Sequence, residues 1–193
     1  ASAPTFDPNN YQASDPSTRR CVAIQNGYEP GSTFKIITLA AAFEEKKVSL
    51  NDTFTDPGFA TILGKRIRCW KAGGHGTQTT VEIAENSCNP GFIELGQRLG
   101  MDKFYKYLLD FGFGRKTGIE MSGEAKGILA DKKKATALDL ATMSIGQTNN
   151  VTPIQLITAV SAVANGGVLL QPQLVQEIIS PDGEVLVPFE KKV

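Results

Sequence analysis

The feature that most restricts the fold of this 193-residue chain is the segment YEPGSTFKIITLAAAFEE at residues 28–45. Its isoleucine, leucine, alanine and phenylalanine residues would cover every face of a helix, so other elements must surround that helix. Lys35 nevertheless lies in the first turn, three residues after Ser32. An ammonium group is therefore placed at the start of a helix that is about to be buried, next to a hydroxyl group.

The overall composition indicates a soluble globular domain and excludes few functions. The chain has 20 basic and 20 acidic residues, so its charge does not favour nucleic acid or an acidic membrane surface as a partner. It has no run of about 18 apolar residues, and its first ten residues lack the pattern of a signal peptide. Three cysteines are too few for a disulfide framework, which leaves free thiols, one pair or a metal site.

The positions of turn residues and polar segments along the chain predict a mainly helical α+β fold with short hairpins. Residues 1–30 are rich in proline, asparagine, serine and aspartate, and we expect them to form an extended lead-in. Residues 31–170 are expected to form a helical subdomain with a hairpin near residues 54–70. Residues 171–193 read as a C-terminal hairpin around the turn at Pro181, Asp182 and Gly183.

Several helix boundaries can be placed from capping signals. A threonine followed three residues later by an acidic or amide residue is typical of a capping box. Pro90 suits the first position of a helix that Gly100 closes, and Asp102 would begin the next helix, which Gly112 ends. The threonine starts are Thr79 with Glu82, Thr136 with Asp139, and Thr152 with Gln155.

The pair Ser32 and Lys35 has the composition of an activated nucleophile. A serine hydroxyl is a weak nucleophile until a base accepts its proton, and a lysine can be that base when burial lowers its pKa. Three residues apart at a helix start, the two side chains share a face, and the backbone N–H groups suit a developing oxyanion. The pattern S-x-x-K alone is common, however. On this pattern alone, the favoured interpretation is that Ser32 is an ordinary N-cap and that Lys35 extends to water.

The flanking motifs decide between these interpretations. S-x-x-K followed by S-x-N is the order found in penicillin-binding proteins and serine β-lactamases, and here Ser32 to Lys35 is followed by Ser87-Cys88-Asn89. The segments FDPNNY, YEPGSTFK, NSCNPGFIELGQRLG, FGFGRKTGIEMSGE and SIGQTNNVTPIQL resemble class B penicillin-binding proteins, the transpeptidases of peptidoglycan synthesis. CWKAGGHG followed by SCN is most similar to the stage V sporulation protein D branch. The resemblance covers nearly the whole chain.

This resemblance implies a D,D-transpeptidase and gives each site residue a role. Ser32 would attack the carbonyl of the penultimate D-alanine of a stem peptide, and Lys35 would accept its proton. Ser87 would pass a proton to the departing D-alanine, and Asn89 would hydrogen-bond the substrate amide and Lys35. An amine of a neighbouring stem would then resolve the acyl-enzyme as a crosslink, and β-lactams would block Ser32.

Lys116-Thr117-Gly118 matches the third motif of the family, K-T-G, in its letters only. The functional motif lies on an edge strand next to the nucleophile, whereas these residues follow a predicted helix and continue into IEMSGE. We therefore interpret them as a loop with a structural glycine.

The resemblance then implies the helical part of a penicillin-binding/β-lactamase-like transpeptidase domain, with the central sheet largely missing and the third motif beyond Val193. Lacking one oxyanion donor, such a chain is not expected to turn over, and its exposed apolar faces would favour oligomerisation.

We also predict a structural zinc site built from Cys69, His75 and Cys88, with Asp56 as the fourth ligand. Thiolate and imidazole are ligands that zinc prefers, and four protein ligands would close the site. Asp56 is chosen because it precedes the hairpin that ends at Cys69, and because sporulation relatives often carry a cysteine at that point. Two alternatives stay open: buried free thiols, or a disulfide between Cys69 and Cys88 that acts as a redox switch. Cys21 is expected to be a free thiol.

Three functions thus compete: a transpeptidase, a metal-stabilised binding scaffold without turnover, and a serine β-lactamase. The last is disfavoured because no glutamate in the position of a deacylating base is recognisable. The resemblance implies peptidoglycan stem peptides and β-lactams as ligands and a membrane glycosyltransferase as partner, with no nucleic acid. It also implies an extracytoplasmic location, with attachment to the membrane through an N-terminal helix outside this chain.

Overall fold

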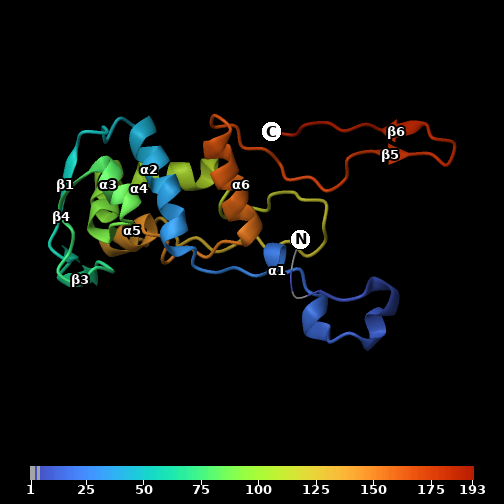
Figure 1. Cartoon of the computed structure of the whole chain (residues 1–193), viewed down its shortest axis with the longest axis horizontal. Coiled ribbons are helices and arrows are strands. Elements are labelled where there is room, and N and C mark those ends of the chain that lie inside the picture. The colour runs from blue at the N-terminus through green and yellow to red at the C-terminus, as the bar shows by residue number, and fades with distance from the viewer. Residues whose placement is uncertain (1–2, 4) are drawn as a thin grey trace. The chain divides into compact units, whose positions relative to one another are not determined.

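The computed structural model describes residue 3 and residues 5–193 of the chain, and it divides them into two compact units (Figure 1). The first unit consists of Ala1–Gly27, Phe111–Gly127 and Val151–Val193, and the second of Tyr28–Asp110 and Ile128–Asn150. Helices dominate and the strands are short, so the predicted mainly helical α+β fold is confirmed. The predicted division into residues 1–30, 31–170 and 171–193 stays a prediction.

The second unit is built around three helices. They are α2 (Lys35–Glu44), α4 (Asn89–Asp110) and α5 (Ala137–Ser144), and α4 packs against both of the others. Gly96 of α4 lies so close to α5 that an added Cβ would come within 2.6 Å of the Ser144 Cβ. The small residue therefore lets the two helices approach each other closely.

Gly100 interrupts α4 as the sequence predicts. Its φ of 75° and ψ of 161° are non-helical, so the α4 range contains two helical segments that meet at a kink. Glycine has no Cβ and adopts a positive φ at little steric cost. The two helices expected on either side of Gly100 are therefore both present.

Two antiparallel strand pairs and one short helix complete the second unit. Strand β1 (Thr53–Asp56) pairs with β4 (Gly76–Thr79), and β2 (Phe59–Ile62) pairs with β3 (Lys65–Arg68). Ile62 pairs with Lys65, so the β2–β3 hairpin turns at Leu63 and Gly64, within the range in which a hairpin was expected. Helix α3 (Thr80–Glu85) follows β4 directly.

All three predicted capping boxes form. Thr79 caps α3 with Glu82, Thr136 caps α5 with Asp139, and Thr152 caps α6 (Pro153–Ala164) with Gln155. In each box the threonine hydroxyl accepts the N–H of the third helical residue, whose own side chain accepts the N–H of the threonine. These local signals fix the helix starts independently of the tertiary packing.

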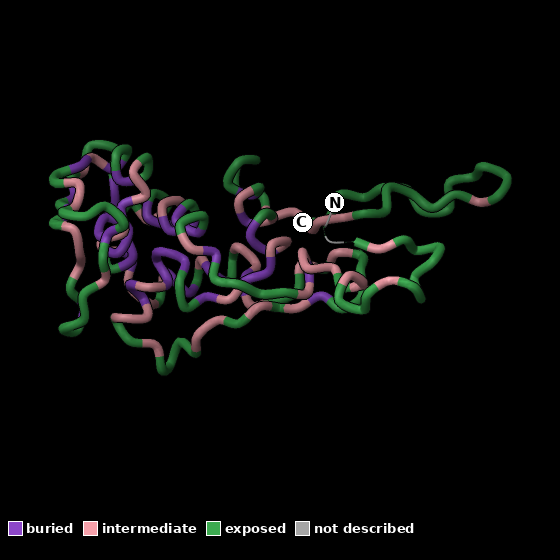
Figure 2. Tube along the Cα trace, turned by 60° about the horizontal axis from the view of Figure 1, so that its bottom comes forward, coloured by how far each residue is buried: buried purple, intermediate pink, exposed green. Residues whose placement is uncertain are grey.

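The first unit contains α6, the short helix α1 (Val22–Gln25), which packs against it, and a C-terminal hairpin. Its N-terminal segment is not uniformly extended, because the 3₁₀ turns η1 (Pro8–Ala13) and η2 (Pro16–Arg19) form within it. Asp7 and Asp15 each cap a turn that starts at proline, a signal for a helical start that the sequence analysis missed. The hairpin pairs β5 (Ile178–Ile179) with β6 (Val185–Val187), and both strands are exposed along their length (Figure 2).

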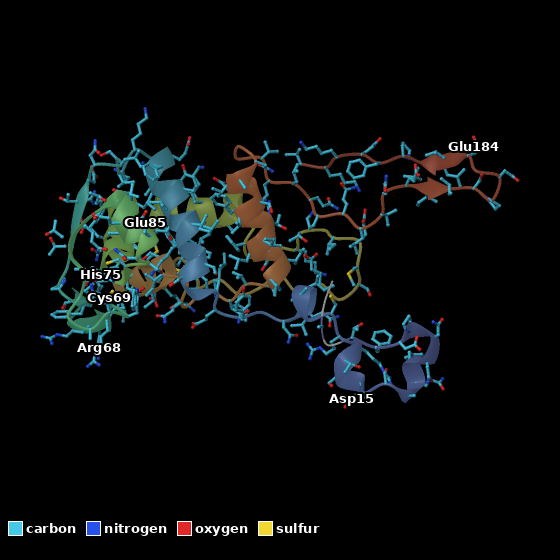
Figure 3. All side chains as sticks on the ribbon, viewed as in Figure 1. Asp15, Arg68, Cys69, His75, Glu85 and Glu184 are labelled. Carbon is cyan, nitrogen blue, oxygen red and sulfur yellow. The ribbon has the colours of Figure 1, made fainter. Side chains whose placement is uncertain are left out.

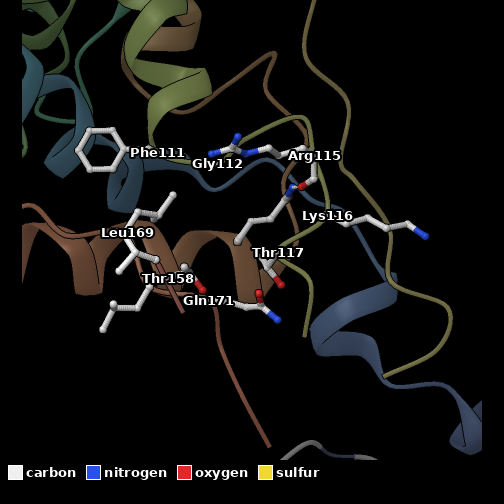
Figure 4. Close-up of a pocket in the computed structure, with 11 residues that line it drawn as sticks. Phe111, Gly112, Arg115, Lys116, Thr117, Thr158, Leu169 and Gln171 are labelled. Carbon is white, nitrogen blue, oxygen red and sulfur yellow. Dashed lines mark hydrogen bonds between the residues drawn. The ribbon is translucent and has the colours of Figure 1, made fainter. Parts of the chain in front are cut away.

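The segment Lys116-Thr117-Gly118 lies in an irregular loop of the first unit, as predicted, and not in a strand. It borders a cavity of about 290 Å³ between the loop, α6 and residues 169–171 (Figure 4). The Lys116 side chain extends away from the other labelled side chains in that view.

No helix in the described part of the chain is both long and apolar enough to span a bilayer.

Candidate active site

Ser32 lies on a tight 3₁₀ turn, η3 (Gly31–Phe34), which leads directly into α2. The turn is held by a hydrogen bond from the Gly31 N–H to the Gly146 carbonyl, 2.9 Å long. Gly146 is required here, because an added Cβ would come within 2.0 Å of the Gly31 oxygen. The Ser32 side chain is exposed and is not a helix cap, so the turn presents its hydroxyl to solvent.

Lys35 is buried, with 3% of its surface exposed, and its ammonium group meets both ends of the S-x-N motif. Nζ donates to the Ser87 carbonyl at 2.6 Å, to Ser87 Oγ at 3.0 Å and to Asn89 Oδ1 at 2.7 Å. The alternative in which Lys35 extends to water is therefore wrong. The fold joins residues that are more than 50 positions apart in the sequence.

Burial lowers the pKa of Lys35 to about 8, and the nearby Cys88 and Cys69 groups oppose this shift by smaller amounts. A lysine of ordinary pKa is almost entirely protonated at neutral pH, whereas a pKa of about 8 leaves a minor but appreciable fraction of this amine neutral. After deprotonation the amine has two N–H donors and one lone pair. Two of the three observed contacts can then persist while the lone pair accepts a proton.

Ser32 is not hydrogen-bonded to this cluster. The three bonds of the Lys35 ammonium go to Ser87 and Asn89, and none joins it to Ser32 Oγ within the residues that the structure describes. The structure thus brings three of the four predicted catalytic residues together and places the fourth one helical turn from Lys35. In ligand-free enzymes, catalytic hydrogen bonds are often long and tighten only when substrate binds.

The S-x-N motif is shaped by the end of α3. The Cys88 N–H bonds to the Ile83 carbonyl and the Ser87 N–H to the Ala84 carbonyl, which together form a Schellman motif. Ser87 takes the left-handed position of that motif, with a φ of 48°. The next residue but one, Asn89, opens α4. The motif therefore turns sharply between two helices and directs both side chains at Lys35.

Sequence reasoning missed the groups that support the motif from outside. Asn89 Nδ2 donates to the Arg68 carbonyl at 3.0 Å, and Trp70 Nε1 donates to the Asn86 carbonyl at 2.8 Å. The Phe92 ring centroid lies 5.3 Å from Lys35 Nζ and covers the ammonium. Phe92 follows Asn89 by three residues on α4, so helical spacing could have indicated it. The other two contacts go to main-chain carbonyls, which every residue has, so the sequence gives no indication of them.

Asp56, Cys69, His75 and Cys88 form a compact group whose potential ligand atoms all lie within 4.8 Å of one another. His75 Nδ1 is 2.8 Å from Asp56 Oδ2 and 3.5 Å from Cys69 Sγ, and Cys88 Sγ is 3.3 Å from the same carboxylate oxygen. Figure 3 places Cys69 and His75 together at one side of this unit. The structure therefore contains a possible metal-binding group made of all four predicted ligands.

Hydrogen bonds hold the buried Asp56 of this group as an anion. Desolvation alone would raise the pKa of Asp56, but hydrogen bonds from Cys69, His75, the Gly58 N–H and Cys88 outweigh it and lower the pKa to about 2. The Asp56 side chain is fully buried as an anion, and desolvation raises the pKa of Cys88 to about 11. The buried His75 Nε2 has no hydrogen-bond partner among the described residues.

Comparisons with known proteins identify the family of this site. A model of the penicillin-binding protein transpeptidase domain matches residues 1–193. Stage V sporulation protein D of Bacillus subtilis is 55% identical over 183 residues, which cover 94% of this chain and 28% of that protein. Peptidoglycan D,D-transpeptidase MrdA of Escherichia coli is 31% identical over 196 residues, covering 90% of this chain and 31% of that protein. The chain thus spans less than a third of the length of these relatives.

A solved structure agrees with the sequence relatives. Penicillin-binding protein 3 from Mycobacterium tuberculosis, complexed with aztreonam, superimposes with a TM-score of 0.88 at 28% sequence identity. The match covers 97% of this chain and 42% of that chain. The fold, the site geometry and both kinds of comparison lead to one assignment. The chain belongs to the family of penicillin-binding protein transpeptidase domains.

Proposed function

We propose that this chain carries the acylating half of a serine-type D,D-transpeptidase that crosslinks peptidoglycan. The observation that carries the proposal is the buried Lys35 ammonium, held by Ser87 and Asn89. Its lowered pKa makes it a competent general base close to neutral pH. Ser32 lies one turn away on the exposed face of η3, where a substrate can reach it.

The proposed reaction has two halves. Ser32 Oγ attacks the carbonyl carbon of the penultimate D-alanine while Lys35 Nζ takes the hydroxyl proton. The tetrahedral intermediate collapses when Ser87 delivers a proton to the departing D-alanine nitrogen and takes back the one held by Lys35, and an ester to Ser32 remains. An amine of a second stem peptide then attacks this ester, forms the new amide bond and releases Ser32. A β-lactam would follow the first half only, and the aztreonam complex of the related structure supports such a ligand.

The proposal is tested by finding the acylated residue in the full-length protein to which this chain belongs. After incubation with labelled penicillin, mass spectrometry should place the adduct on the peptide that contains Ser32. Ser32→Ala should remove it, and Ser161→Ala, which changes an exposed serine on α6, should not. An adduct that persists in Ser32→Ala would rule out the assignment. Rapid release of hydrolysed penicillin would indicate a β-lactamase, and no adduct at all would indicate a binding scaffold.

The possible metal-binding group favours a second proposal, a structural zinc ion held by Asp56, Cys69, His75 and Cys88. Two thiolates, one imidazole and one carboxylate form a four-ligand set of the kind that zinc binds, and the four groups are already gathered and largely buried. When bound, zinc would crosslink the hairpin strands to the S-x-N turn and take no part in acyl transfer. The residues would thereby keep Ser87 and Asn89 in position for Lys35.

Elemental analysis of protein purified without chelator or added metal tests the zinc proposal. We expect one equivalent of zinc, its loss in Cys88→Ser, and its retention in Cys21→Ser, since Cys21 lies outside the group. Zinc well below one equivalent, with two fewer titratable thiols than the three that the sequence contains, would identify a disulfide between Cys69 and Cys88 instead.

The cellular setting follows from the same family and belongs to the proposal. We place the domain on the outer side of the cell membrane, attached through an N-terminal helix of the full-length protein. There it would act on stem peptides beside a membrane glycosyltransferase. Co-purification of the full-length protein from membranes with such an enzyme tests the partner directly.

A further inference from the structure

A charged groove lies beside the candidate active site, on the β2–β3 hairpin and the loop after it. The groove has a volume of about 570 Å³. Within the described part of the chain, its lining includes cationic and aromatic side chains and no acidic one. The residues that the argument needs are Phe59, Arg66, Arg68, Trp70 and Lys71.

The hairpin register puts the two arginines on one face. Phe59 pairs with Arg68 and Thr61 with Arg66, and residues two apart in a strand point to the same side. The Arg66 guanidinium lies 4.5 Å from the centroid of the Phe59 ring, which supports it without neutralising it. Both arginines are exposed, and Figure 3 shows Arg68 at the edge of its unit, close to Cys69.

The positive charge of this region is unbalanced. Residues 57–81 contain no aspartate or glutamate but four basic residues, although the chain as a whole has equal numbers of acids and bases. Within the described residues, none of the four forms an ion pair. Unpaired arginines held on a rigid strand are well suited to bind a carboxylate through two parallel hydrogen bonds. The basic residues are Lys65, Arg66, Arg68 and Lys71.

The groove is joined to the catalytic motif by two hydrogen bonds. Asn89 Nδ2 donates to the Arg68 carbonyl, and the Trp70 indole donates to the carbonyl of Asn86, the residue before Ser87. The strand that carries the arginines is thereby fixed against the residues proposed to hold the substrate amide. Trp70 is 66% exposed and offers a flat apolar surface next to the cations. A ligand in the groove would therefore lie next to the peptide that reacts at the catalytic motif.

We propose that this groove binds a carboxylate-bearing peptide segment of the substrate, with Arg66 and Arg68 as the anion contacts and Trp70 as the apolar contact. This inference rests on the transpeptidase function proposed above. The carboxylate belongs either to the donor peptide that acylates Ser32 or to the acceptor peptide whose amine attacks the ester. Both sources present the same chemistry to the arginines.

Binding can be measured apart from catalysis. In the full-length protein carrying Ser32→Ala, calorimetric titration compares a stem peptide that has a free side-chain carboxylate with the same peptide amidated there. We expect the free acid to bind about 10- to 100-fold more tightly, the range of a charge-assisted hydrogen bond. The added variants Arg66→Gln and Arg68→Gln should remove most of that difference, while the backbone carbonyl of residue 68 remains for Asn89.

The matched control is Lys133→Gln with Lys134→Gln, which removes the same charge from an exposed part of the same unit. This control should keep the preference for the free acid. Three outcomes would overturn the inference: equal affinity for the free acid and the amidated peptide, the same loss of preference in the lysine control as in the arginine variants, or competition by heparin as strong as that by the free acid. The first outcome denies a carboxylate site, and the other two indicate general attraction of anions.

Kinetic arms distinguish the two sources of the carboxylate. These measurements use the catalytically active protein. If the groove binds the donor peptide, Arg66→Gln should be acylated more slowly than the unmodified protein by a donor that carries the carboxylate, with a neutral acceptor present. If the groove binds the acceptor peptide, Arg66→Gln should be acylated normally by a neutral donor but should transfer the acyl group more slowly to an acceptor peptide that carries the carboxylate. Absence of penicillin acylation in the unmodified protein would refute the proposed function, whereas the peptide titration would still decide whether the groove binds carboxylates.

Discussion

Lys35 and Lys116 both lie in motifs typical of one enzyme family, yet their surroundings differ in almost every respect. Lys35 is buried and donates three hydrogen bonds to groups far away in the sequence. Lys116 is exposed in an irregular loop, and its ammonium makes no hydrogen bond or ion pair within the described residues. Burial and partners, and not the motif letters, make a lysine reactive.

The loop around Lys116 has a structural explanation of its own. The buried Glu124 carboxylate accepts hydrogen bonds from the N–H and the hydroxyl of Thr117 and from the N–H of Gly118. Gly118 has a φ of 82°, which favours glycine. Threonine and glycine are therefore needed here to close a loop around an acid, and the lysine beside them is incidental.

The largest expected effect is that of Lys35→Ala on acylation. Without a base for the Ser32 hydroxyl, the second-order rate constant for labelled penicillin should fall by about 10²–10⁴ in the full-length protein. Lys35→Met, which keeps the length and apolar stem of the side chain, should show the same loss if the amine is what matters. A loss below tenfold in both variants, with intact folding by circular dichroism, would remove Lys35 from the base role.

The pH dependence of acylation should follow Lys35. Its pKa is lowered by burial to about 8, and only the neutral amine can accept a proton. The rate should therefore rise about tenfold per pH unit below pH 8 and level off above it. Stopped-flow measurements from pH 6 to pH 9.5 would show this. A flat profile over that range would mean that another group is the base.

Glu124→Gln should weaken the fold of the first unit. The amide has one acceptor oxygen for three donors, and its NH₂ group would face N–H groups. The free energy of unfolding should fall by about 1–3 kcal/mol, measured by urea denaturation. Glu177→Gln, at an exposed position before β5, is the matched control and should change it by less than about 0.5 kcal/mol. Equal effects of the two changes would contradict the role of Glu124.

Lys116→Ala should have the smallest effect. The acylation rate constant of the full-length protein is expected to stay within about threefold of normal, because loss of a true oxyanion or carboxylate contact costs about 10²–10³. The same penicillin assay measures it, and its pH profile should match that of the unmodified protein. A hundredfold loss would restore Lys116-Thr117-Gly118 as a functional motif.

The sequence was most informative where a structure depends on neighbours in the chain. The capping boxes, the break at Gly100 and the two predicted hairpins all form, since each is encoded within a few residues. The same local logic was overlooked at Asp7-Pro8 and Asp15-Pro16, which start 3₁₀ turns in a segment expected to be extended. Both turns could be predicted from this Asp-Pro capping signal, although the polar composition of residues 1–30 favours an extended segment.

The candidate site was predictable as a set of residues but not as a geometry. Motif order indicated Lys35, Ser87 and Asn89, and ligand chemistry indicated the four-residue group around His75, which the structure brings together. Within the described residues no hydrogen bond joins Ser32 to Lys35, and this could not be foreseen, because the three Lys35 donors are directed at Ser87 and Asn89, more than 50 positions away. The hydrogen bond from Asn89 to the Arg68 carbonyl could not be predicted either, since every residue has a carbonyl.

The left-handed backbone at Ser87 has a consequence for how such domains change over time. A serine in this conformation is less stable than a glycine by about 0.5–1 kcal/mol, once the greater freedom of unfolded glycine is counted. Mutation to glycine would relieve this backbone strain, but it would remove the hydroxyl that accepts a hydrogen bond from Lys35 and that is proposed to relay a proton. Selection on backbone conformation alone would favour glycine at this position, so it is the hydroxyl, through its bond to Lys35 and its proposed chemistry, that would retain serine. A homologous chain with glycine at this point should still bind its ligands but should have abandoned catalysis.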